Sequence, residues 1–188
     1  METPTELRPT PPPLRSIATA LRATGWLSFW IQLGLGTVSV LALLFAYSGR
    51  NFTDTTVSIS VGIFWAITAI VTLLINLFQS FRYTRLARRF RNPDAPQPPK
   101  KNDTVQIVRW SLVIAIVGVT LALLGSGSAI GVMLAKAIAL PQGVAIYDPS
   151  KIIRAMDILV AGANLVAIAA HFIALVMNLW LFGWLSRQ

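Results

Sequence analysis

Four long apolar segments dominate this chain of 188 residues and determine the solvent in which it can fold. They cover about 25–47, 57–81, 105–124 and 158–185. Each is long enough for a helix to cross a hydrocarbon core of about 30 Å. Hydrophobic residues make up 55% of the chain and charged residues 12%, against roughly 25% charged in soluble domains. We therefore predict an all-α polytopic membrane bundle, because four segments are too few for a closed β-barrel.

The flanking and connecting segments divide the chain further. Residues 1–18 are rich in proline and predict a disordered cytoplasmic tail, followed by a membrane domain over 19–188. Nothing in this tail resembles a signal or transit peptide, so we expect the first membrane helix itself to direct insertion. Residues 82–104 predict a basic linker, into which the second helix extends as an amphipathic turn ending at Asn92 and Pro93.

A run of small residues, GSGSAIG at 125–131, follows the third apolar segment. A single helix from Val105 to Leu140 would measure about 54 Å, far more than a hydrocarbon core. The glycines therefore predict a bend at this run. Beyond it, residues 129–140 predict one short helix that is interfacial or re-entrant.

Basic residues are unevenly distributed along the chain, whose net charge is +9. Four of the sixteen lie near the ends of the apolar segments that face away from the linker: Arg50, Lys136, Lys151 and Arg154. The others lie at the opposite ends, which predicts that both termini are cytoplasmic. Five linker arginines are expected to contact anionic lipid headgroups: Arg82, Arg85, Arg88, Arg89 and Arg91. A docking site for an acidic partner protein is the alternative, and nucleic acid is not expected as a ligand.

The fourth apolar segment contains a polar residue at every seventh position: Asp157, Asn164, His171 and Asn178. These four residues, called the polar stripe below, share one helix face, which should avoid lipid. One interpretation is hydrogen bonding between packed helices. The other is a pathway for a cation, completed by Asn76 and Gln32 on two further helices.

His171 is the only histidine, and the chain has no cysteine. We predict that His171 and Asp157 bind a metal ion such as iron at most transiently, because the rest of the interior supplies few ligands beyond amides. A homo-oligomer could place several copies of these two residues around an axis. Lys136 is expected to reach the interface or to pair with Asp157 or Asp148.

Enzyme signatures are absent from the sequence, including phosphate-binding glycine loops, GxSxG and HExxH. We therefore expect neither a catalytic activity nor a resident cofactor.

Several ordered motifs resemble a known family. They are RATGWLSFWIQL at 22–33, FRYTRLARRFR at 81–91, MLAKAIA at 133–139, QGVAIYDP at 142–149 and MDILVAGANLVAIAAHFIAL at 156–175. The family comprises small four-helix inner-envelope proteins of chloroplasts and their cyanobacterial relatives. It is called permease in chloroplasts and is also assigned to the Tic protein-import translocon.

The resemblance implies an all-helical membrane protein with one of two proposed activities, iron permeation or protein import. The iron-permease activity is the first expectation, and a structural or translocon-type subunit with partners in a membrane complex is the alternative. The chain differs from chloroplast members in lacking a recognisable transit peptide and in its compact segment after 133–139. We therefore expect a cyanobacterial plasma or thylakoid membrane.

Overall fold

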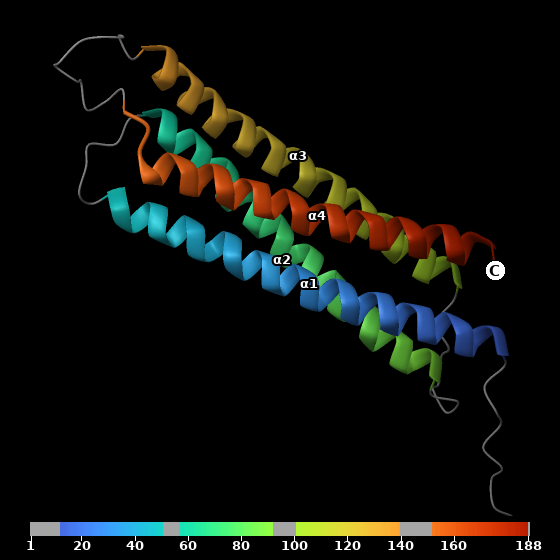
Figure 1. Cartoon of the computed structure of the whole chain (residues 1–188). Coiled ribbons are helices and arrows are strands. Elements are labelled where there is room, and N and C mark those ends of the chain that lie inside the picture. Colours follow the sequence, from blue (N-terminus) through green and yellow to red (C-terminus); the bar gives the residue numbers. More distant parts are fainter. Residues whose placement is uncertain (1–11, 51–56, 92–100, 140–151, 188) are drawn as a thin grey trace, which may run out of the picture.

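The computed structural model describes residues 12–50, 57–91, 101–139 and 152–187. Within these ranges lie four α-helices: α1 (Pro12–Arg50), α2 (Val57–Arg91), α3 (Lys101–Ala139) and α4 (Ala155–Arg187) (Figure 1). Consecutive helices run in opposite directions. The starts of α1 and α3 and the ends of α2 and α4 therefore lie together, at what we call the basic end.

In the four-helix bundle, one pair of diagonally opposite helices is in contact and the other pair, within the described ranges, is not. α2 contacts α4 directly, and α1 and α3 each pack against both, whereas the described parts of α1 and α3 do not contact each other. Alanines fill the middle of the interior, with Ala69, Ala122 and Ala167 in one buried cluster. Small side chains allow helices in a membrane to approach closely, which is why this centre is narrow.

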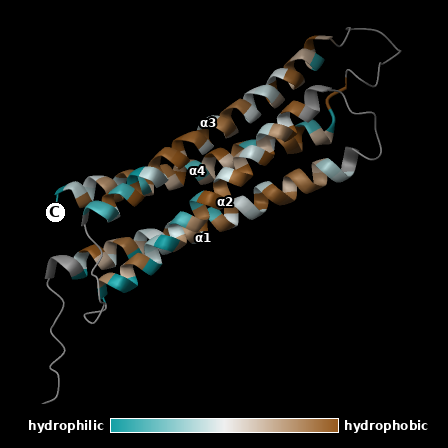
Figure 2. Cartoon of the chain, turned by 180° about the vertical axis from the view of Figure 1, so that it is seen from behind, coloured by the Kyte–Doolittle hydropathy of each residue, from teal (hydrophilic) through white to brown (hydrophobic). Residues whose placement is uncertain are grey.

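Large apolar side chains cover the outside of the bundle. Phe45 is 68% exposed and Ile138 is 76% exposed. Such surface would be costly in water but is suited to lipid. All four helices are long and apolar enough to cross a membrane, as predicted. Figure 2 shows the hydrophobic colouring along the helices and the hydrophilic colouring gathered mainly at the basic end.

The helices extend beyond the apolar segments predicted for them. α1 begins at Pro12, so residues 12–18 are helical although they were assigned to the disordered tail. Proline is tolerated in the first turn of a helix, where its missing N–H has no partner to lose. α2 continues to Arg91, which confirms its predicted basic extension. The rest of the tail, residues 1–11, and residues 92–100 of the linker lie outside the described residues.

The bend predicted at 125–131 is wrong, and so is the short helix over 129–140. α3 is one helix of 39 residues from Lys101 to Ala139, and Leu140 lies outside the described residues. A break inside a membrane would leave backbone groups without hydrogen-bond partners, so the helix continues through the glycines. Its length of about 58 Å exceeds a hydrocarbon core of about 30 Å, so we expect its ends to extend beyond that core.

Candidate functional site

The polar stripe of α4 points into the bundle. Asp157 is 4% exposed, Asn164 and His171 are 0% exposed, and Asn178 is 5% exposed. Alanines on the same face, such as Ala167 and Ala174, are buried as well. The stripe avoids lipid as predicted, and each of its residues meets α2, α3 or both.

His171 is held by hydrogen bonds to α2. Its Nε2 lies 3.0 Å from the carbonyl oxygen of Ala69, which can only accept, so Nε2 carries a proton and donates it. Its Nδ1 then accepts from the Nδ2 amide group of Asn76 at 3.0 Å. The hydroxyl of Thr72 lies 3.4 Å from Nε2. Both ring nitrogens of a neutral imidazole are therefore engaged within the bundle.

Two glycines of α3, Gly118 and Gly125, make room for the stripe. The sequence analysis did not single out Gly118, and it assigned Gly125 to a bend. A methyl group at Gly118 would overlap the ring of His171, and one at Gly125 would overlap the amide of Asn164. Asn164 also donates to the carbonyl of Val160 at 2.9 Å. The available signal was spacing, because Gly118 and Gly125 are seven residues apart, as are Asn164 and His171.

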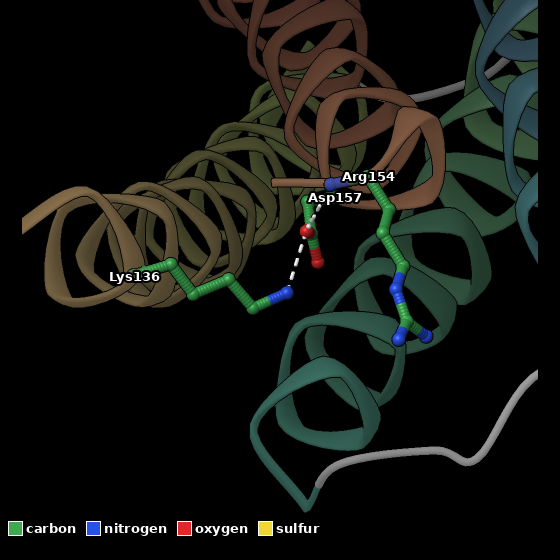
Figure 3. A network of polar contacts seen from close by, with 3 residues as sticks. All are labelled: Lys136, Arg154 and Asp157. Atoms are coloured by element: carbon green, nitrogen blue, oxygen red, sulfur yellow. Dashed lines mark hydrogen bonds and ion pairs between the residues drawn. The ribbon is translucent and has the colours of Figure 1, made fainter. Parts of the chain in front are cut away.

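At the end opposite the basic end, Lys136 of α3 pairs with Asp157 at 2.6 Å, as one of the predicted pairings had it (Figure 3). The same carboxylate oxygen accepts the backbone N–H of Arg154 at 2.9 Å. This second bond closes the first turn of α4, where a negative charge is favourable. Asp157 therefore both caps α4 and joins it to α3.

Asn178 occupies the end of the stripe nearest the basic end. Its Oδ1 accepts a hydrogen bond of 2.9 Å from the hydroxyl of Tyr83 on α2. Tyr83 is 1% exposed and was not among the predicted site residues. Tyr83 lies within a run of arginines that the sequence analysis assigns to the membrane interface, so its burial is not predicted from the sequence.

Gln32 belongs to α1, and its side chain faces α2 and not the stripe. Its amide nitrogen donates to the hydroxyl of Ser28 and, at 3.2 Å, to that of Ser80. Ser80 donates in turn to the backbone carbonyl of Asn76 at 3.1 Å. Polar contacts thus connect α1 through α2 to His171 on α4.

Four buried side-chain oxygens have no hydrogen-bond partner within the described structure. They are Gln32 Oε1, Asn76 Oδ1, Asp157 Oδ1 and Asn164 Oδ1. All four belong to the set predicted to line a pathway, and oxygen donors of this kind suit hard cations. Successive stripe residues are about 10 Å apart along α4, so Asp157 and Asn164 cannot jointly enclose one ion.

The predicted metal ligands are not brought together within one chain. His171 and Asp157 are separated by four turns of α4, or about 21 Å. The described residues contain no group of three His, Cys, Asp or Glu side chains that could hold a metal ion. The donors of the described residues therefore do not form a resident iron site.

These features define an integral membrane protein of the small polytopic class, whose interior polar side chains join four antiparallel helices. The chain belongs to the family described as Protein of unknown function (DUF3611), whose profile matches residues 11–186.

The chain is also similar to Protein TIC 21, chloroplastic, of Arabidopsis thaliana, with 29% identity over 177 residues. The match covers 88% of this chain and 56% of the relative, so the chain spans about half the relative's length. It confirms the resemblance inferred from the sequence motifs. No solved structure matches the chain.

Proposed function

We propose that the chain is a non-catalytic subunit of a membrane protein complex, of the translocon or transporter type. The observation that supports this is the closed polar interior, in which each residue of the polar stripe bonds to a group of this same chain. Such a network fixes how helices pack and leaves their outer faces for lipid and partners. The resemblance to a family assigned to the Tic translocon supports the same role.

The ion pair also argues for a closed bundle. The Lys136 ammonium occupies one oxygen of the only carboxylate in the stripe, at 2.6 Å. A cation entering from that end would meet a positive charge and would have to displace it. Resting permeation through a single bundle is therefore disfavoured.

Purification from native membranes in a mild detergent tests the subunit proposal. We expect the chain to migrate with other subunits in fixed ratio during size-exclusion chromatography. Migration as an isolated bundle, together with transport by the pure protein, would contradict it.

Cation permeation, with iron as the cargo suggested by the resemblance, is the second candidate function. Four unpartnered oxygens in the interior favour it, because they could bind a hard cation once the helices separate. Iron uptake into proteoliposomes that hold the pure protein is the test. Uptake above empty vesicles, reduced by His171→Gln or Asp157→Asn in folded protein, would support permeation over the subunit role.

We propose further that the basic end faces the cytoplasm, in a cyanobacterial plasma or thylakoid membrane. The arginines at the end of α2 support this orientation, since cytoplasmic segments carry an excess of basic residues. An alkaline-phosphatase fusion after Lys101 should be inactive and one after Pro149 active. The reverse pattern would contradict the orientation.

A further inference from the structure

A hollow of about 270 Å³ lies between α2 and α3 at the basic end. Its lining combines three arginines with three apolar residues: Phe78, Arg82, Arg85, Leu86, Arg89 and Ile107. The α2 members recur at helical spacing and share one face, while Ile107 comes from α3. Cationic and apolar groups in one hollow match a ligand that joins an anionic group to a hydrocarbon chain.

Neighbouring side chains orient two of the three guanidinium groups. Arg82 donates to the side-chain oxygen of Gln79 at 3.0 Å. The guanidinium carbon of Arg85 lies 4.9 Å from the centre of the Phe81 ring. Both contacts leave further N–H donors of each fork available for an anion.

The positive charge of this hollow is not neutralised within the described part of the chain. Asp103 and Asp157 are its only carboxylates, and Asp157 pairs with Lys136 at the other end. Asp103 lies one turn from Ile107 on α3, but it forms no ion pair with the three arginines. Three like charges on one face repel each other, and a bound anion would relieve that repulsion.

Contacts between helices show how deep the hollow lies in the membrane. Three of them set the register: Gln32 with Ser80, Tyr83 with Asn178, and Gly118 with His171. Counted from these contacts, the exposed Trp30, Trp110 and Trp180 lie close to the level of Arg82. Tryptophans mark the boundary between hydrocarbon and headgroups. Arg82 therefore lies at headgroup depth, and Phe78 lies one turn deeper, in the hydrocarbon.

We propose that this hollow binds one anionic phospholipid, with its phosphate against Arg82, Arg85 and Arg89 and an acyl chain along Phe78 and Ile107. Guanidinium forks match phosphate oxygens in geometry and charge. A zwitterionic lipid would bring its own cation towards the three arginines and should bind less well. This proposal does not depend on the function proposed above.

The sequence alone predicted the same role for all five arginines of this segment, but the structure separates them. All five arginines are exposed, but Arg88 and Arg91 do not line the hollow. Arg109 of α3 is exposed as well and is absent from the lining. These three residues supply a control that removes equal charge at the same end of the bundle.

Native mass spectrometry of the delipidated full chain in detergent can test the proposal. The probes are dioleoyl phosphatidylglycerol, dioleoyl phosphatidylcholine and glycerol 3-phosphate. The site variant carries Arg82→Gln, Arg85→Gln and Arg89→Gln, and the control carries Arg88→Gln, Arg91→Gln and Arg109→Gln. We expect the site variant to bind phosphatidylglycerol at least about tenfold more weakly than the unaltered chain, and the control within about twofold.

Three results would overturn the proposal. Equal losses in both variants would show diffuse attraction to the whole basic end. Equal affinity for the two lipids would remove the role of charge. Binding of glycerol 3-phosphate as tight as that of phosphatidylglycerol would indicate a site for free phosphate esters.

Circular dichroism establishes that each variant is folded. If the site variant does not fold, substitution of the same three arginines by lysine keeps the charge and removes the forked geometry. We then expect affinity for phosphatidylglycerol to fall at least about threefold. Unchanged affinity in this lysine variant would overturn the proposal.

Discussion

Gly118→Ala tests whether the contact between α3 and His171 holds the bundle together. The added methyl group would overlap a ring that is fully buried and hydrogen-bonded on both nitrogens. Overpacking of this kind costs about 1–3 kcal/mol, and displacement of the ring would weaken two hydrogen bonds worth about 0.5–1.5 kcal/mol each. The better helix propensity of alanine offsets about 1 kcal/mol of this loss in stability. We expect a net loss of about 1–5 kcal/mol in unfolding free energy.

Gly131→Ala is the matched control on the same helix, because a methyl group there has nothing within 4 Å. Because the gain in helix propensity is common to both variants, thermal unfolding in detergent, followed by circular dichroism, should place Gly118→Ala about 4–24 °C below this control. A second measurement combines Gly118→Ala with His171→Ala. If the ring is what the methyl group meets, the double variant should lose less stability than the two single losses added together. Equal melting of both glycine variants, or simple additivity, would refute the reasoning.

Three further predictions concern the polar contacts, each measured by thermal unfolding against the unaltered chain. Lys136→Met should lower the unfolding free energy by about 3–5 kcal/mol, because it leaves the charge of Asp157 buried and unpaired. Adding Asp157→Leu should restore most of this stability. No recovery in the double variant would contradict the ion pair. Tyr83→Phe should cost about 1–3 kcal/mol because Asn178 loses its donor, and an unchanged melting temperature would contradict that bond. His171→Gln should lose less than half of what His171→Ala loses, because an amide still supplies a donor and an acceptor; equal losses would show that only the ring shape matters.

Hydropathy and periodicity alone predicted the four helices and the buried face of α4. A long apolar segment in lipid can satisfy its backbone hydrogen bonds only as a helix or in a closed barrel. Polar residues at every seventh position of a helix lie on one face, which must then be the buried one. Asn76 was assigned correctly to the neighbourhood of the stripe, and it hydrogen-bonds to His171. Gln32 was placed in the same pathway, but it bonds to serines between α1 and α2.

The interpretation of the glycines failed for a physical reason. Glycine lowers helix propensity in water, where a freed backbone group can bond to solvent, and this argument predicted a bend at 125–131. In a bilayer the backbone has no such substitute, so helical bonding persists and the missing side chain matters more. Gly125 is used for the close approach of Asn164, a partner from a different helix that local sequence does not reveal.

The seven-residue spacing of the stripe has a consequence for how the chain finds one arrangement. If α4 slid along α3 by one heptad, Asn164 would lie opposite Gly118 and Asp157 opposite Gly125. The glycines would still accommodate polar side chains after this shift. They therefore do not distinguish two alignments of α3 and α4 that differ by seven residues. The ion pair between Lys136 and Asp157 does not repeat every seven residues. In the shifted arrangement Asp157 would be about 10 Å away from Lys136 along the helix. Among the contacts described between α3 and α4, the ion pair thus distinguishes the native alignment from the shifted one, and its loss should make the alignment of these two helices less specific.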